Sequence, residues 1–100
     1  MYDMKNCQKF EKFGQLIPQA FKSFLAFDEI SFKAGAIPAK YKELMAVAVA
    51  LTTQCPYCIE IHSKRAKLAG ANETELAEAT LVAAALRAGS SVTHGTHTLE

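Results

Sequence analysis

Prolines and glycines divide this chain into segments about as long as the helices of globular proteins. The breaks are Gly14, Pro18, Gly35, Pro38, Pro56 and Gly70. Proline suits the first turn of a helix, where its missing N–H has no partner to lose, and glycine commonly follows a helix end. Between the breaks alanine, leucine, lysine and glutamate predominate, and β-branched residues do not alternate over any length typical of a strand. The chain is therefore predicted to be all-α.

Five helices are expected, over residues 4–13, 18–33, 38–53, 56 to 68 or 69, and 73–88. Only Gln54 and Cys55 separate the third helix from the fourth, which predicts an antiparallel helix hairpin. Asn72 precedes Glu75 by three residues, a pattern typical of a reciprocal helix cap. Residues 89–91 (Gly-Ser-Ser) interrupt the last pattern, so residues 92–97 either continue as a kinked turn or form a separate short helix.

The longest apolar run is residues 44–51, and a helix that is apolar on every side is expected to be buried all round. The second helix carries apolar residues at helical spacing, and these are expected to pack in the core or against another subunit. They are Phe21, Phe24, Leu25 and Phe32, with Ile17 before the proline.

The composition favours one globular domain over residues 1–100, with a core of about 17–97. A chain this short buries only roughly 60 to 65% of its unfolded surface, while 50% of its residues are hydrophobic. An oligomer is therefore expected. The net charge of +1 provides no field to attract nucleic acid or an anionic membrane.

The polar N-terminus does not resemble a secretory signal, and residues 44–51 are too few to span a bilayer. A cytoplasmic location is therefore expected. In a reducing compartment a close cysteine pair indicates a metal-binding or catalytic site rather than a structural disulfide. Cys7 is interpreted as an incidental thiol.

The cysteine pair lies in the stretch TTQCPYCIEIH, residues 52–62. A residue before proline avoids helical backbone angles, so Cys55 is predicted to be the N-cap of the fourth helix and Cys58 its third residue. The free N–H groups and the dipole at a helix N-terminus stabilise a thiolate. Cys55, Cys58 and His62 fall on a stripe about 60° wide, with His62 one turn beyond Cys58. The imidazole is thus a candidate base for a dithiol.

Glu43 is a candidate partner for this histidine, because it is the one acid of the third helix beyond the first turn. Counted back from the hairpin turn, Glu43 lies level with Ala66, roughly one turn or ~6 Å past His62. A carboxylate at that position would hold the imidazole tautomer. The alternative is an exposed glutamate that pairs with Lys40 or Lys42.

These residues resemble the alkylhydroperoxidase D core of the carboxymuconolactone decarboxylase family. The resemblance covers roughly residues 17–97, including AIPAKYKELMAVAVALTTQCPYC, with an acid twelve residues before the first cysteine. This chain corresponds to about one core domain of the longer, duplicated alkylhydroperoxidase D, and Tyr57 stands where that protein has a histidine. The decarboxylase branch lacks the cysteine pair, so the pair favours the redox branch.

The resemblance implies an all-helical, oligomeric peroxidase, a trimer or hexamer, that needs no bound cofactor. Cys58 would attack the peroxide, Cys55 would resolve the sulfenate to a disulfide, and His62 and Glu43 would relay the proton. An external dithiol of lipoyl or thioredoxin type would reduce the disulfide. From the residues alone, the N-cap position favours Cys55 as the more acidic thiol, while the neighbouring histidine favours Cys58.

Three other functions remain open. Cys55, Cys58 and His62 could bind zinc, with His94 or Glu43 as the fourth ligand. The cysteines could instead pack as small hydrophobic residues in a non-catalytic helical assembly module. A general thiol–disulfide oxidoreductase would use the same dithiol on a different acceptor. His94 and His97 are expected to be solvated in the tail, and Tyr57 is expected to shape the entrance to the site.

Overall fold

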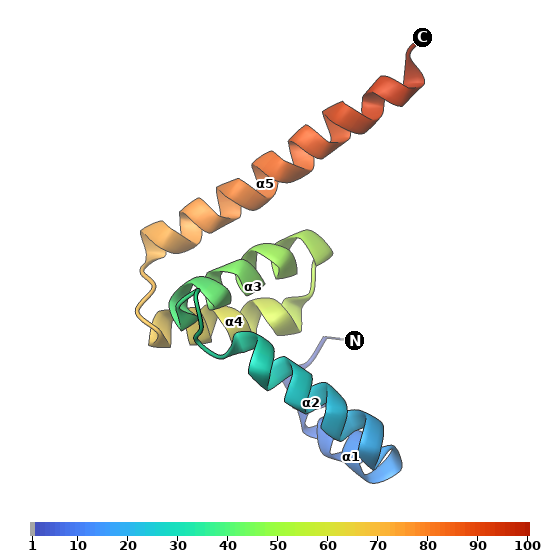
Figure 1. Ribbon diagram of the computed structural model, residues 1–100, viewed down its shortest axis with the longest axis vertical. Coiled ribbons are helices and arrows are strands. Elements are labelled where there is room, and N and C mark those ends of the chain that lie inside the picture. The colour runs from blue at the N-terminus through green and yellow to red at the C-terminus, as the bar shows by residue number, and fades with distance from the viewer. Residues whose placement is uncertain (1) are drawn as a thin grey trace.

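A computed structural model describes residues 2–100, which are helical throughout apart from the turns and the two ends (Figure 1). The helices are the 3₁₀ helix η1 (Met4–Lys9), α1 (Phe10–Leu16), α2 (Pro18–Phe32), α3 (Ala39–Thr53), α4 (Pro56–Leu68), α5 (Glu73–Gly95) and the 3₁₀ helix η2 (Thr96–Thr98). The predicted all-α class is thus confirmed. Within residues 2–100, no helix has the length and apolar character required to cross a membrane.

The hairpin of α3 and α4 is the centre of the molecule, as predicted, and α5 packs along α3 (Figure 1). Its turn is tight because Gln54 adopts the left-handed conformation (φ 56°) and Cys55 then extends into Pro56. The core is built from small and medium side chains, which lets the three helices approach closely. The buried apolar residues are Leu44, Val47, Ala50, Ala66, Ala71 and Ala83.

The start of α5 has the predicted reciprocal cap. The side chain of Asn72 accepts a hydrogen bond from the Glu75 N–H at 2.8 Å, and the Glu75 carboxylate accepts one from the Asn72 N–H at 3.0 Å. Glu75 also pairs with Lys40 of α3 at 2.9 Å. This ion pair raises the pKa of Lys40 and lowers that of Glu75. Cap and ion pair together attach the first turn of α5 to the hairpin.

Two predicted helix ends are wrong. The expected first helix is divided into η1 and α1, and α1 continues through Gly14 to Leu16. The rings of Phe10 and Phe13 pack against Phe21 of α2, and this contact offsets the roughly 1 kcal/mol cost of a helical glycine. The expected end of the last helix at residue 88 is also wrong, because α5 runs unbroken through residues 89–91 to Gly95.

The prediction that residues 44–51 are buried all round is wrong as well. One face of α3 packs on α4 and α5, but Met45 and Val49 are 47% and 60% exposed. The expected packing of the second helix is only partly realised within this chain, since Ile17, Phe24 and Leu25 remain about half exposed. Within residues 2–100, both faces thus keep a substantial exposed apolar area.

Candidate dithiol site

The turn between α3 and α4 places both cysteines at the start of α4. Cys55 is the N-cap, as predicted, and its sulfur accepts a hydrogen bond from the Cys58 N–H at 3.3 Å. Both cysteines are free, and a hydrogen bond joins their Sγ atoms at 2.8 Å. The CxxC spacing on a helix start therefore brings the two sulfur atoms into direct contact.

The two thiols differ in acidity. The hydrogen bond with the Cys58 thiol lowers the pKa of Cys55, and the Cys58 N–H adds to this effect by stabilising the Cys55 thiolate. The same contact raises the pKa of Cys58 to about 11, because it favours the protonated form of this thiol beside a Cys55 thiolate, and burial adds to the rise. In this conformation Cys55 is the more acidic thiol.

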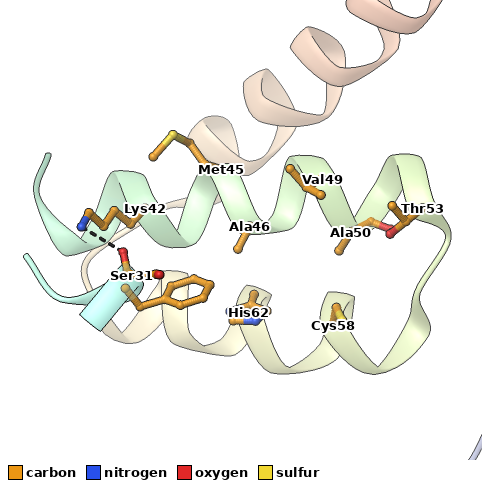
Figure 2. A pocket seen from close by; sticks show the side chains of 10 residues that line it. Ser31, Lys42, Met45, Ala46, Val49, Ala50, Thr53, Cys58 and His62 are labelled. Carbon is orange, nitrogen blue, oxygen red and sulfur yellow. Dashed lines mark hydrogen bonds between the residues drawn. The ribbon is translucent and has the colours of Figure 1, made fainter. Parts of the chain in front are cut away.

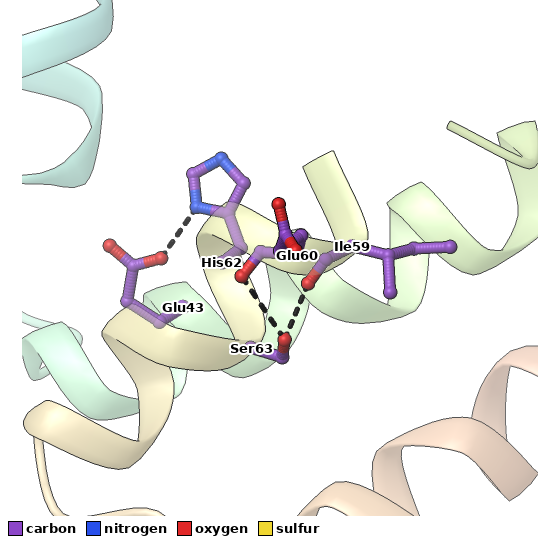
Figure 3. A network of polar contacts seen from close by, with 5 residues as sticks. All are labelled: Glu43, Ile59, Glu60, His62 and Ser63. Atoms are coloured by element: carbon purple, nitrogen blue, oxygen red, sulfur yellow. Dashed lines mark hydrogen bonds and ion pairs between the residues drawn. The ribbon is translucent and has the colours of Figure 1, made fainter. Parts of the chain in front are cut away.

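Glu43 and His62 form a buried pair between α3 and α4 (Figure 3). The imidazole Nδ1 lies 2.7 Å from the Glu43 Oε2, and the side chains are 15% and 11% exposed. The predicted partnership is thus present, and the alternative of an exposed Glu43 is wrong. Lys40 pairs with Glu75 instead, and Lys42 donates to backbone carbonyls at the end of α2. Nearby, the Ser63 hydroxyl bonds only to carbonyls of its own helix.

The contact with Glu43 determines which nitrogen of the His62 imidazole carries the proton. Since the carboxylate accepts a hydrogen bond, Nδ1 carries the proton in the neutral tautomer and the lone pair is on Nε2. The imidazole is therefore held ready to accept a proton at Nε2. Among the described residues, no hydrogen bond yet joins this ring to Cys58.

Cys58 and His62 do share a cavity of about 420 Å³ between α3 and α4 (Figure 2). Its wall is largely apolar, with the thiol toward one end and Lys42 at the other. The lining residues are Ser31, Phe32, Lys42, Met45, Ala46, Val49, Ala50, Thr53, Cys58 and His62. Thiol and base thus face one space into which a small substrate could enter.

A second cavity of about 420 Å³ lies on the N-terminal side of the cysteines, and its lining includes Cys7 together with Cys55, Cys58 and Tyr57. The Tyr57 hydroxyl accepts hydrogen bonds from the Asp3 N–H at 3.2 Å and the Asn6 side chain at 2.9 Å. Tyr57 thus fastens the N-terminal segment beside the dithiol. The sequence offered no sign of this contact, because the partners are more than fifty residues apart.

Two predicted candidates lie elsewhere. His94 lies in the last turn of α5 and His97 in η2, both exposed, with their rings 5.8 Å apart. This end of the chain projects away from the hairpin (Figure 1). The two histidines are therefore remote from the cysteines. Within residues 2–100, no three histidine, cysteine or acidic side chains gather in a way that could hold a metal ion. The arrangement of side chains thus does not favour the zinc interpretation.

The profile of the carboxymuconolactone decarboxylase family matches residues 18–100. The chain belongs to this family. A carboxymuconolactone decarboxylase family protein from Legionella pneumophila, solved in its apo form, superimposes with a TM-score of 0.78 at 30% identity. That match covers 92% of this chain and 82% of the Legionella chain. A protein from Methanobacterium thermoautotrophicum gives a TM-score of 0.81 at 34% identity, over 88% of this chain and 99% of the other.

Sequence relatives are uncharacterized proteins. "Uncharacterized protein 4 in cox locus" of Paracoccus denitrificans is 46% identical over 77 residues, which cover 77% of this chain and 69% of the relative. An uncharacterized protein of Cupriavidus necator is 34% identical over 71% of this chain and 63% of its own length. The relatives therefore extend beyond the matched part, and their names give no reaction.

Proposed function

We propose that this protein reduces peroxides through the Cys58/Cys55 dithiol, with His62 as proton acceptor and Glu43 as its support. The observation that carries the proposal is that His62, paired with Glu43, shares a cavity with Cys58, whose sulfur is in direct contact with that of Cys55. The resemblance to alkylhydroperoxidase D supports the same chemistry. In the family context, the dithiol is the feature that favours a redox reaction.

The raised pKa of Cys58 explains why a base is needed. A thiol with a pKa of about 11 is almost fully protonated at neutral pH, whereas the thiolate is the form that attacks peroxide. The His62 ring lines the same cavity, and with Nδ1 bonded to Glu43 its Nε2 is the nitrogen that would accept the proton. Transfer of the Cys58 proton to His62 requires the thiol to turn from Cys55 toward the imidazole. Glu43 would then stabilise the imidazolium that forms.

The reaction would proceed in two steps on the protein. The Cys58 thiolate attacks one peroxide oxygen, the O–O bond breaks, and Cys58 becomes a sulfenic acid while the alcohol or water leaves with the proton from His62. The Cys55 thiol then loses its proton and attacks the Cys58 sulfur; the S–O bond breaks, and the hydroxide takes up that proton and leaves as water while the disulfide forms. An external dithiol of lipoyl or thioredoxin type would return two electrons to the pair. Assembly as a trimer or hexamer, and a cytoplasmic location, belong to the same proposal.

A second function, thiol–disulfide exchange, is favoured by one observation. The lowered pKa of Cys55 makes this thiol the more readily ionised nucleophile, as in enzymes that attack protein disulfides. Comparing turnover on peroxide with turnover on a protein disulfide, at equal enzyme and reductant, separates the two functions. Peroxide turnover at least about tenfold above disulfide turnover is expected if His62 serves Cys58 as base.

The direct test is a single-turnover reaction of the reduced protein with hydrogen peroxide and with an organic hydroperoxide. Wild type should lose two free thiols per chain and form the Cys55–Cys58 disulfide, identified by peptide mass mapping. Cys58→Ser should not react, while Cys55→Ser should accumulate a sulfenic acid on Cys58 that dimedone traps. A dimedone adduct on Cys55 in Cys58→Ser would reverse the assigned roles, and unreactive thiols in wild type would refute the peroxidase.

The Glu43–His62 relay has its own test. Glu43→Gln keeps the size of the side chain but cannot stabilise an imidazolium, so the peroxide reaction should slow by about tenfold or more. The apparent pKa of the reacting thiol should rise. Glu75→Gln is the matched control, because it removes a glutamate ion pair outside the cavity and can retain the cap. Equal rates in wild type and Glu43→Gln would exclude the relay.

A further inference from the structure

Phe32, the last residue of α2, stacks on the imidazole of His62. The ring centroids lie 4.8 Å apart and the planes differ by only 10°. The hydrogen bond from Nδ1 to Glu43 acts at the edge of the imidazole, since ring N–H groups lie in the ring plane. The phenyl ring covers its face. Edge and face are thus restrained by residues from two different helices.

The end of α2 is itself attached to α3. Lys42 donates hydrogen bonds from Nζ to the carbonyl oxygens of Ser31 at 2.9 Å and Lys33 at 2.6 Å, the residues on either side of Phe32 (Figure 2 shows the bond to Ser31). Carbonyls in the last turn of a helix lack partners within the helix, and a cation is favourable at this negative end. Lys42 therefore fixes the position of the backbone that carries Phe32.

We propose that Phe32 is a positioning residue for the proton acceptor His62, and that Lys42 holds Phe32 in place from α3. The inference rests on the proposed role of His62 as the base for Cys58. Glu43 selects the tautomer, and Phe32 keeps the ring from tilting out of the plane in which Nε2 faces the cavity. Lys42 and Glu43 are adjacent in sequence, so one turn of α3 orients the imidazole in both respects.

Phe32 also lines the cavity, so a loss of rate in a Phe32 variant could arise from altered substrate binding. A double-mutant cycle separates the two roles. Phe32→Leu, which keeps apolar bulk but removes the flat ring, should lower kcat/KM for peroxide by about tenfold. In a His62→Ala background the same change should have no effect on the residual rate. An equal loss in both backgrounds would mean that Phe32 acts on the substrate, and it would overturn the proposal.

Phe32→Tyr retains the ring and should keep the wild-type rate. Two further measurements do not depend on peroxide turnover. Thermal unfolding of Phe32→Leu, compared with wild type and Phe32→Tyr, shows whether that variant still folds. In the proton NMR spectrum, the imidazole C–H signals of His62 should lie upfield in wild type and Phe32→Tyr because of the stacked ring, and move downfield in Phe32→Leu. Unmoved signals would show that the stack is absent in solution, even if the protein proves not to be a peroxidase.

Lys42 supplies a test from outside the ring stack. Lys42→Met removes both hydrogen bonds to the end of α2, so it should move the His62 signals in the same direction as Phe32→Leu and lower kcat/KM. Lys42→Arg can still donate to both carbonyls and should resemble wild type. If Lys42→Met leaves the His62 signals in place, Lys42 has no part in positioning the ring.

Discussion

At the scale of the residue, geometry gives two identical thiols different chemistry. The Cys58 N–H donates to the Cys55 sulfur, and the contact between the two sulfur atoms lowers the pKa of Cys55 and raises that of Cys58. The difference comes from the place of each thiol at the helix start, since only the Cys55 sulfur also accepts a backbone N–H. His62 shares a cavity with Cys58, the thiol of higher pKa, which is where the proposed mechanism needs a base.

The contact between the two sulfur atoms makes the pKa values of Cys55 and Cys58 depend on each other. In Cys58→Ala the Cys55 thiolate loses its largest stabilising contact, so the pKa of Cys55 should rise toward that of an ordinary thiol. In Cys55→Ala the pKa of Cys58 should fall from about 11, because no thiolate then holds its proton. Ultraviolet absorbance of the thiolate against pH measures both. Unshifted titrations in both variants would show that the sulfur atoms do not interact in solution.

At the scale of the element, α5 shows how a helix continues through residues with poor helix propensity. Gly89, Ser90 and Ser91 lie inside a helix of 23 residues, although together they predicted its end. Propagation of an existing helix adds one hydrogen bond per residue and avoids the cost of nucleation. The Asn72–Glu75 cap and the contact with α3 supply that nucleus. The interruption therefore lowers the stability of α5 without breaking it.

The continuity of α5 leads to a prediction about two glycines. Gly89 lies within the helix, and a methyl group on its Cα would meet open space, so Gly89→Ala should stabilise the protein by about 1 kcal/mol. Gly70, by contrast, has φ 102°, and Gly70→Ala should destabilise by at least a similar amount. Thermal unfolding followed by circular dichroism measures both. A lower midpoint for Gly89→Ala would indicate that the helix ends where the sequence pattern breaks.

At the scale of the whole molecule, the single chain is extended. Its radius of gyration is 16.7 Å, whereas a compact chain of this length has about 13 Å. α5 projects beyond the hairpin, and α1 and α2 project from its other side (Figure 1). Large apolar residues are exposed along α5, namely Leu81, Val82, Leu86 and Val92. These surfaces fit the expectation of an oligomer drawn from the composition.

Sedimentation equilibrium tests this expectation. The mass should be a multiple of 10.9 kDa, three or six chains if the predicted trimer or hexamer forms. Leu86→Glu places a charge on an apolar surface that is 73% exposed in the single chain, and it should reduce the mass. Glu78→Gln, at an exposed polar position of the same helix, should leave the mass unchanged. A monomeric wild type would contradict the expectation.

Local chemistry made much of the fold predictable. The starts at Pro18, Pro56 and Glu73 are where proline and the cap predicted them, because these residues act on backbone groups a few positions away. The Cys55 N-cap and the pairing of Glu43 with His62 also followed from sequence, since a two-residue turn sets the register of the hairpin. At Gly14 the prediction of a helix end was wrong, because the packing of Phe10 and Phe13 on Phe21 offsets the free-energy cost of a glycine within a helix.

Residue spacing alone specified the helices, the hairpin and the presence of a dithiol with a histidine one turn away, because each depends on distances within one helix or across one short turn. The contact of Phe32 with that histidine, and the bonds of Lys42 beside it, were settled only when the helices packed together. Phe32 and Lys42 reach the site through the angle at which α2 meets α3, and that angle depends on packing between helices. No periodicity along the chain encodes it, because contacts between separate elements are set by the sum of many side-chain volumes.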